Sequence, residues 1–241
     1  MPEINDDVLP KLAGAAAEVE ARPAASVIVL RGDPFEVLFL RRSSASTFVP
    51  DAWIFPGGAV DDVDRRLTAA REGDEATTMR LCAARELFEE AGIWIGPPLP
   101  DPERWRARLL DDCDAFEEIC RLAPPELDRL VPTSRWVTPT GVPKRYDTWF
   151  FLLAAGDDAE ATAEEREGME VRWLRPHDAL QAQLDGSFQM VFPTIRNLEA
   201  IAPFPSREAL LAARRGAEIP TTRPRLVVEG GRKRIILPGE E

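Results

Sequence analysis

The fold is decided by one short stretch of the chain, Arg85-Glu86-Leu87-Phe88-Glu89-Glu90-Ala91-Gly92-Ile93. Apolar residues recur here at helical spacing and a glycine follows them, so the stretch predicts a helix that ends at Gly92. At about 100° per residue, Glu86, Glu89 and Glu90 fall within an arc of roughly 100°, and the opposite face of the helix is apolar. The sequence therefore places three carboxylates on one outward side of a helix.

Carboxylates spaced three and four residues apart repel each other by about 0.2–0.5 kcal/mol per pair on an isolated helix. A bound cation would turn that repulsion into attraction. Oxygen-only ligands suit hard ions such as Mg²⁺ or Mn²⁺, and Mg²⁺ commonly completes its shell with substrate phosphates. We therefore predict a metal site for phosphate chemistry at Glu86, Glu89 and Glu90; the alternative is an ordinary solvated acidic helix face.

A second motif lies upstream, in Trp53-Ile54-Phe55-Pro56-Gly57-Gly58-Ala59-Val60-Asp61. The apolar run broken by Pro-Gly-Gly predicts a strand that enters a tight loop, where the backbone of Gly57 and Gly58 can approach a ligand closely. Strand, Gly-rich loop, acidic helix and final glycine together resemble the Nudix box, which reads glycine, five residues, glutamate, seven residues, Arg-Glu-apolar-x-Glu-Glu-x-Gly-apolar. The matching positions are Gly58, Arg85, Glu86, Leu87, Glu89, Glu90, Gly92 and Ile93.

The chain departs from that box in two ways. Asp64 stands where the first glutamate is expected, and twenty residues separate it from Arg85 where the pattern has seven. The thirteen extra residues, at about 65–77, are polar and predict a loop that bulges outward. Asp64 could support the loop, assist the metal or have no counterpart role. The Phe55–Asp61 opening and the Glu86–Gly92 helix also resemble the Nudix branch that includes the acyl-coenzyme A diphosphatases.

The resemblance implies an α+β fold, an α/β/α sandwich with a mixed central sheet, a catalytic strand-loop-helix, a helical insertion and C-terminal helices. We predict an N-terminal arm at residues 1–23 and a single domain at 24–237 with insertions at about 65–77 and 97–132. Strands are expected at 24–31, 36–41, 93–96, 134–138, 147–155 and 170–174, with a hairpin through 225–237 that turns at Gly-Gly. Helices are expected at 102–122, from 176 onward, and at 192–201 and 207–215.

Length, composition and net charge limit the classes of function that the chain can have. With 241 residues, 44% of them apolar, the chain can bury a sizeable core. Its 30 Lys and Arg against 42 Asp and Glu give a net charge of −12, which opposes binding to nucleic acid or to an anionic membrane. The acidic start and the lack of an apolar run of about 20 residues lead us to expect a cytoplasmic protein; a homodimer is left open.

Other catalytic plans find no support in the residue inventory. The three cysteines, Cys82, Cys113 and Cys120, lack metal-ligand spacing and are expected to be reduced, with Cys113, Phe116 and Cys120 in one buried stripe. The single histidine, His177, excludes a multi-histidine metal site and is expected on a helix surface. Neither a P-loop nor a dinucleotide-binding glycine motif occurs.

The family resemblance implies a mechanism. Mg²⁺ or Mn²⁺ held by the three glutamates would act on a small-molecule diphosphate, and Arg85 would brace the glutamates rather than touch substrate. Gly57 and Gly58 would lie beside the metal and the substrate. The alternative interpretation of these two glycines is an ordinary tight turn. The general base stays open between a glutamate of the box and an acidic connection that contains Glu164, Glu165, Glu167 and Glu170.

The substrate is less well defined by the sequence. Lys144 and Arg145 are candidate phosphate contacts, with a charged strand entry as the alternative, and Trp149 is a candidate for adenine stacking, with core packing as the alternative. Coenzyme A or acyl-coenzyme A follows from the resemblance. A nucleotide sugar, a dinucleotide or a dinucleoside polyphosphate is the enzymatic alternative, and a non-catalytic nucleotide-binding regulatory module is the alternative of another class.

Overall fold

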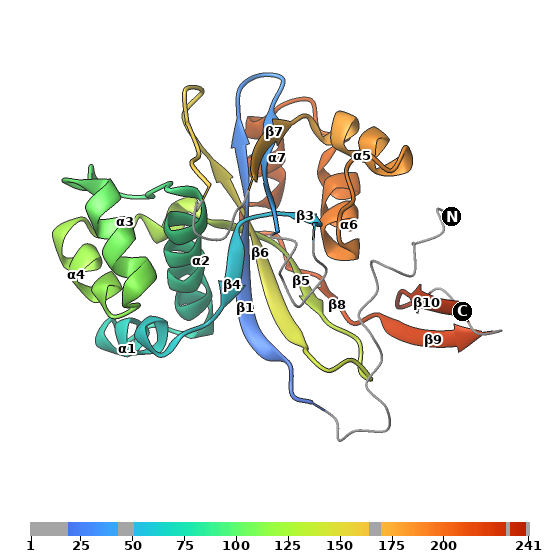
Figure 1. Cartoon of the computed structure of the whole chain (residues 1–241), viewed down its shortest axis with the longest axis horizontal. Helices are drawn as coiled ribbons and strands as arrows, with labels where there is room; N and C mark the ends of the chain where they lie inside the picture. The colour runs from blue at the N-terminus through green and yellow to red at the C-terminus, as the bar shows by residue number, and fades with distance from the viewer. Residues whose placement is uncertain (1–18, 43–50, 164–169, 230–231, 240–241) are drawn as a thin grey trace.

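A computed structural model describes residues 19–42, 51–163, 170–229 and 232–239. An eight-stranded sheet lies in the middle of the molecule, with helices on both sides (Figure 1). Its strands are β1 (Arg22–Arg31), β2 (Glu36–Arg41), β3 (Trp53–Ile54), β4 (Gly57–Ala59), β5 (Val131–Val137), β6 (Tyr146–Ala154), β7 (Glu170–Leu174) and β8 (Thr221–Thr222). The order is β3-β2-β1-β6-β5-β8, with β4 paired to β1 and β7 to β2.

The sheet is mixed and covered on both faces. β1 runs parallel to β6 and antiparallel to β2. Along β1, Val27 and Val29 enter one core cluster while Ile28 and Leu30 enter the other, and all four are fully buried. Successive side chains of a strand point to opposite faces, so a continuous apolar strand needs cover on both sides. The predicted α/β/α sandwich is therefore confirmed.

The helices divide between the two faces, as Figure 1 shows. One face carries α1 (Asp62–Ala70), α2 (Glu75–Ala91), α3 (Pro102–Asp111), α4 (Ala115–Leu122) and the short 3₁₀ helix η2 (Leu127–Arg129). The other face carries α5 (Pro176–Leu184), α6 (Phe192–Ile201) and α7 (Arg207–Arg214). The first group contains the predicted acidic helix, so the candidate metal ligands belong to this layer.

Most predicted elements are present. The bounds of β2, β7 and α6 are as expected, and α5 begins at Pro176 with His177 exposed. β9 (Arg225–Glu229) and β10 (Arg232–Ile236) form the predicted antiparallel hairpin, as a separate two-stranded sheet. The Gly-Gly turn at 230–231 and residues 1–18 of the predicted arm lie outside the described residues.

The insertion after Asp64 is not the expected loop. Most of it is helical, because α1 continues to Ala70 and α2 begins at Glu75. The helix begins in a capping box: Asp61 accepts a hydrogen bond from Val63 N, and the Asp64 carboxylate accepts one from Asp61 N at 2.9 Å. Val63 and Leu67 are buried in the helical layer. Leu67 of the insertion thus extends an apolar stripe that begins at Val63, four residues earlier, and the insertion folds onto the core rather than outward.

Two further expectations were wrong. The single helix over 102–122 is two helices, since Asp112 is extended (φ −149°, ψ 106°) and ends α3. The helices then lie against each other, where Arg108 Nη2 pairs with Glu118 Oε1 at 2.9 Å. The expected strand at 93–96 has no strand conformation. Ile95 is buried instead, and its carbonyl accepts a hydrogen bond from Glu126 N, so this segment serves packing.

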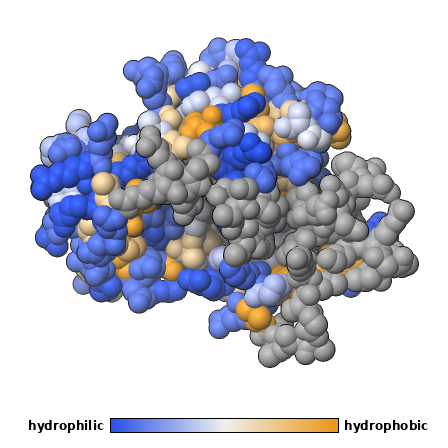
Figure 2. All heavy atoms as spheres, viewed as in Figure 1, coloured by the Kyte–Doolittle hydropathy of each residue, from blue (hydrophilic) through white to orange (hydrophobic). Residues whose placement is uncertain are grey.

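The described cysteines are free thiols, with Cys82 and Cys120 buried and Cys113 half-buried. Phe116 and Cys120 are buried on α4, which confirms that part of the predicted apolar stripe, whereas Cys113 lies in the turn before the helix. Hydrophilic residues cover most of the visible described surface in Figure 2, and apolar residues show as small separate patches. Within the described ranges, no helix combines the length and apolar character needed to cross a bilayer.

Candidate metal centre and substrate cleft

Helix α2 carries the candidate ligands in its last two turns. Its first turn is capped by Asp74, whose carboxylate accepts a hydrogen bond from Thr77 N at 2.9 Å. It ends at Gly92, which adopts the left-handed conformation (φ 68°) and donates its N–H to Phe88 O at 3.0 Å. Leu87 and Phe88 are fully buried against the sheet, and the glutamates on either side of them in the sequence are turned toward β4.

Arg85 is buried at the centre of the acidic cluster. Its Nη1 donates to Glu86 Oε1 at 2.9 Å and to Glu89 Oε2 at 3.1 Å. Its Nη2 donates to Asp64 Oδ2 at 2.9 Å and to Ala59 O at 2.9 Å, and its Nε donates to Asp64 Oδ1 at 3.1 Å. The arginine therefore braces two of the candidate ligands and the loop before them, as the family resemblance implies.

The role of Asp64 is now defined. Its side chain is fully buried, pairs with Arg85 through both oxygens, and closes the capping box of α1. Of the three roles left open by the sequence, the structure shows support of the loop and of Arg85.

The two glycines of β4 admit the acidic side chains. Gly57 N donates to Glu90 Oε2 at 2.7 Å. A Cβ on Gly58 would lie 2.5 Å from the Glu86 carboxylate, and a Cβ on Gly57 would collide with Ala25 O and lie 2.6 Å from Ser26 Cα. Only glycine lets the strand approach both the helix and its neighbour β1 this closely.

Burial and mutual repulsion favour the protonated forms of the glutamates. Burial, followed by the charge of Glu86, raises the pKa of Glu89 to about 8, although Arg85 opposes the shift. Burial and the same charge raise the pKa of Glu90 well above its ordinary value, against the opposing Gly57 N–H. The pKa of Glu86 is raised by burial as well. Burial alone would lower the pKa of Arg85, but its hydrogen bonds to Asp64 and the charge of Glu86 raise it.

The donor set fits a divalent cation. Within the described ranges, no three acidic, histidine or cysteine side chains converge as a ready metal cage, and Glu86 and Glu89 turn to Arg85 instead. The cluster nevertheless holds three closely spaced carboxylates whose charge burial disfavours, and a cation would supply the missing compensation. Hard oxygen donors are those that Mg²⁺ and Mn²⁺ prefer.

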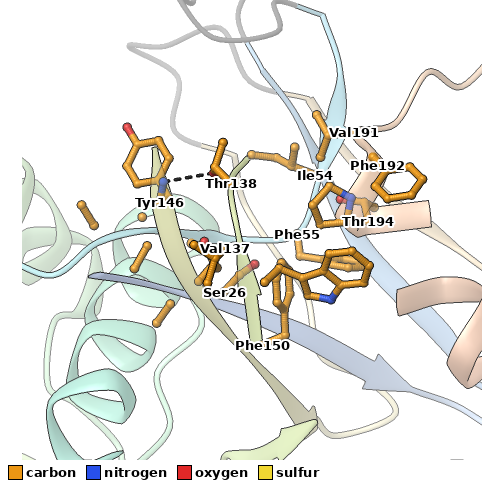
Figure 3. A pocket seen from close by; sticks show the side chains of 18 of the residues that line it. Ser26, Ile54, Phe55, Val137, Thr138, Tyr146, Phe150, Val191, Phe192 and Thr194 are labelled. Atoms are coloured by element: carbon orange, nitrogen blue, oxygen red, sulfur yellow. Dashed lines mark hydrogen bonds between the residues drawn. The ribbon is translucent and has the colours of Figure 1, made fainter. Parts of the chain in front are cut away.

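A cleft of about 430 Å³ opens beside Glu86 and Glu90, whereas Glu89 is absent from its lining. Glu86, Glu90, Gly57 and Gly58 line one part of it. The remaining lining is mostly apolar and comes mainly from β1, the end of β3, β5, β6, the start of α6 and the C-terminal hairpin. Figure 3 shows Tyr146 and Val137 on one side and Phe192 and Thr194 on the other. The cleft thus joins an acidic end to an apolar chamber.

Not every predicted contact lines this cleft. Lys144 and Arg145 are absent from the lining, and Arg145 donates to Thr138 O at 3.1 Å and to Val19 O at 2.6 Å. Trp149 packs against the helical layer, with the Arg135 guanidinium 5.1 Å from its ring centre, as the core-packing alternative expects. Glu170 pairs with Arg41 at 3.0 Å.

Residues 164–169, which include the other acidic candidates for the base, lie outside the described residues.

Sequence reasoning missed several lining residues. Arg42, at the end of β2, lines the cleft, and its charge acts on Glu90. Trp136 and Phe192 line it as an edge-to-face aromatic pair with centroids 5.9 Å apart. Arg41 and Arg42 follow the apolar residues of the predicted strand 36–41, and this pair of positive charges could have indicated a phosphate contact at Arg42. Trp136 and Phe192 are far apart in the sequence, so no local pattern could have indicated that they form a pair.

Comparison with known proteins agrees with this architecture. The model of the NUDT19 Nudix domain matches residues 69–201, more than half of the chain. The fold also matches the crystal structure of a NUDIX hydrolase from Alicyclobacillus acidocaldarius, with a TM-score of 0.72 and 28% identity over 84% of this chain and 100% of that one. The chain therefore belongs to the Nudix hydrolase family. Within the family, its relatives are of the NUDT19-like branch.

Three curated relatives are similar to this chain. Putative nudix hydrolase 7 of Caenorhabditis elegans is 30% identical over 192 residues, covering 75% of this chain and 60% of that protein. Acyl-coenzyme A diphosphatase NUDT19 of Gallus gallus is 29% identical, covering 66% of this chain and 62% of that protein. The Homo sapiens protein of the same name is 26% identical, covering 71% and 62%. The chain thus spans about three fifths of the length of these relatives.

Proposed function

We propose that the protein hydrolyses the diphosphate bond of a nucleoside diphosphate-linked substrate with Mg²⁺ or Mn²⁺, and that this substrate is coenzyme A or acyl-coenzyme A. The observation that carries the proposal is the meeting of Glu86 and Glu90 with the glycines of β4 at one end of a largely apolar cleft. The relatives named acyl-coenzyme A diphosphatase support the choice of substrate.

The chain's own residues have distinct tasks in this reaction. Glu86, Glu89 and Glu90 would hold the metal, which when bound neutralises phosphate charge and acidifies water. Arg85 fixes the carboxylates of Glu86 and Glu89, so their positions are set before substrate arrives. Arg42 places a positive charge in the cleft, where it can meet a phosphate. Water is added across the P–O–P bridge, and the products are two phosphate monoesters.

A carboxylate is the expected general base of this reaction. Closely spaced carboxylates titrate apart, so one glutamate of α2 can remain a proton acceptor while the others bind the metal. The pKa of Glu89, raised to about 8 by burial before metal binds, shows how strongly the cluster resists full ionisation. The candidates for the base are therefore these three residues and the acidic connection that contains Glu164, Glu165, Glu167 and Glu170.

The test is a substrate panel analysed by mass spectrometry, with Mg²⁺ or Mn²⁺ and with chelator. The panel holds acyl-coenzyme A, coenzyme A, ADP-ribose, NADH, a nucleotide sugar and diadenosine polyphosphate. Adenosine 3′,5′-bisphosphate and a phosphopantetheine fragment are the expected products. Glu89→Gln should lower the rate by about 10²–10⁴-fold, while Glu75→Gln, on the exposed first turn of the same helix, should not.

Each alternative has its own outcome. Cleavage of ADP-ribose, the nucleotide sugar or the dinucleoside polyphosphate in place of coenzyme A would keep the reaction and change the substrate. Nucleotide binding without cleavage of any panel member would favour the regulatory module. Metal affinity that is equal in wild type, Glu89→Gln and Glu90→Gln would remove the proposed metal site itself.

A further inference from the structure

One wall of the cleft comes from a part of the chain remote from the box. Pro224, Leu226 and Ile235, on and just before the C-terminal hairpin, line the same cleft as Glu86 and Glu90. Leu226 and Ile235 are direct partners across the β9–β10 ladder, so their side chains lie on one face of the hairpin. Both side chains are half-buried, which leaves part of their surface open to the cleft.

The chemistry of this wall selects one kind of ligand group. All three side chains are aliphatic or prolyl and offer no hydrogen-bond donor or acceptor. A ligand hydroxyl, base edge or phosphate pressed against them would lose water without gaining a partner, at about 1–3 kcal/mol for each unpaired group. A hydrocarbon chain has no hydrogen bonds to water to lose, so its contact with this wall carries no such cost. The aromatic pair Trp136 and Phe192 offers a separate surface suited to a planar ring.

We propose that Leu226 and Ile235 form the specificity wall for the acyl group of the substrate. The inference rests on the proposed function, because it takes the diphosphate to sit at Glu86 and Glu90. A ligand anchored there extends the remainder of its length along the cleft, and the hairpin face is one of the surfaces it meets. The hairpin thus makes the site prefer acyl-coenzyme A to free coenzyme A.

The size of the expected effect follows from apolar burial. Each methylene removed from water raises affinity about fourfold. Replacing Ile235 by serine removes apolar contact and adds a hydroxyl, so we expect it to lower the preference for the acyl ester by roughly tenfold.

The chain supplies a matched control at the next residue. Ile236 follows Ile235 on the same strand, is half-buried, and does not line the cleft. Alternation places its side chain on the opposite face of the hairpin. Ile235→Ser and Ile236→Ser therefore make the same chemical change at neighbouring positions of β10, and only position 235 faces the cleft.

Binding is measured on the 241-residue chain by calorimetry with Ca²⁺ in place of Mg²⁺, so that the glutamates keep an oxygen-preferring cation for the diphosphate, using coenzyme A and dodecanoyl-coenzyme A as probes. Mass spectrometry of the sample after the titration verifies that neither probe was cleaved. Wild type and Ile236→Ser should bind the acyl ester at least tenfold more tightly than coenzyme A, and Ile235→Ser should lose most of that ratio. Leu226→Ala, with Val227→Ala as its control, repeats the test should Ile235→Ser fail to fold. A ratio of one in wild type, or an unchanged ratio in both cleft-facing variants, would overturn the proposal.

A parallel assay with Mg²⁺ separates the two proposals. Tight, hairpin-dependent binding of dodecanoyl-coenzyme A without its cleavage would support the wall and overturn the proposed activity. Cleavage of coenzyme A and its acyl ester at equal kcat/KM in wild type would support the activity and overturn the wall.

Discussion

Asp64 reaches Arg85 although it is one methylene shorter than the glutamate of the Nudix box. It does so because α1 carries it: the same carboxylate that closes the capping box at Asp61 N points its oxygens at the guanidinium. The Asp64 carboxylate is thus held both by the first turn of α1 and by Arg85, so the geometry of the buried ion pair is fixed. Removing one partner of such a pair leaves the other charge buried without full compensation.

Asp64→Asn should therefore lower the free energy of unfolding by about 3 kcal/mol, the lower end of the range for a broken buried pair, since Arg85 keeps Glu86 and Glu89. Urea unfolding followed by circular dichroism measures the change. Asp62→Asn is the matched control, because Asp62 is exposed in the same turn of α1. Equal midpoints for the two variants would contradict the assigned role of Asp64.

Gly57 and Gly58 are neighbours with opposite expected outcomes. A Cβ at Gly57 meets the fixed backbone of β1, so Gly57→Ala should destabilise the fold by about 2–3 kcal/mol. The three atoms nearest to a Cβ at Gly58 all belong to the Glu86 carboxylate, the end of a side chain, which can shift against its hydrogen bond from Arg85 where a backbone cannot. Gly58→Ala should therefore unfold within about 0.5 kcal/mol of wild type and still lose activity by roughly tenfold or more, because a small displacement of a ligand slows the reaction.

Thermal unfolding and kcat, measured on both variants, check this contrast. A stable and fully active Gly58→Ala protein would show that the position of Glu86 does not limit the reaction.

At the scale of elements, the sequence predicted those whose local signals agree with their packing. β2, β7 and α6 have clear apolar patterns and end where their flanking residues predict. The insertion was predicted wrongly because its polar composition masks Leu67, which continues an apolar stripe from Val63, just before the insertion, and packs only once α2 is beside it. Asp112 likewise ends α3 inside a continuous helical pattern, since the chain must turn back to place α4 on the core. Both errors came from tertiary contacts that override local composition.

Helix α2 gives the metal-free protein a pH-dependent stability. The pKa of Glu89 is raised to about 8 in the folded state from an ordinary value of 4.5, so the folded state holds the proton more tightly than the unfolded state. This contribution is fully present below about pH 4.5 and is lost as pH rises through about 8. In EDTA, the melting temperature should thus be lower at pH 9 than at pH 6.

Mg²⁺ should raise the melting temperature more at pH 9 than at pH 6, because it binds the ionised carboxylates. Differential scanning fluorimetry at both pH values, with and without Mg²⁺, gives the comparison. Glu89→Gln should flatten the profile in EDTA, and a wild-type profile as flat as that of the variant would refute the assignment to Glu89.

At the scale of the whole molecule, the cleft could not be predicted from the sequence. Its walls combine β4 and α2, which carry the box, with β5, β6, the start of α6 and the hairpin. These elements meet because β1 pairs in parallel with β6 and because the chain then crosses the second face of the sheet. The box predicted the acidic end because its ligands are close in sequence. Trp136, Phe192 and Ile235 have no such local signature, and a topology is needed to place them beside Glu86.

Net charge acts on this assembled cleft from a distance. The chain carries −12, and a diphosphate substrate is also anionic, so long-range repulsion should slow their encounter at low salt. The Debye length falls from about 30 Å at 0.01 M to about 8 Å at 0.15 M, which screens distant charges and leaves contacts within the cleft almost unchanged. With metal kept saturating, kcat/KM should therefore rise roughly twofold or more over that range, while kcat stays constant. A fall in kcat/KM with added KCl would mean that positive charges at the cleft, Arg42 and the bound metal, outweigh the net charge of the protein and steer the substrate in.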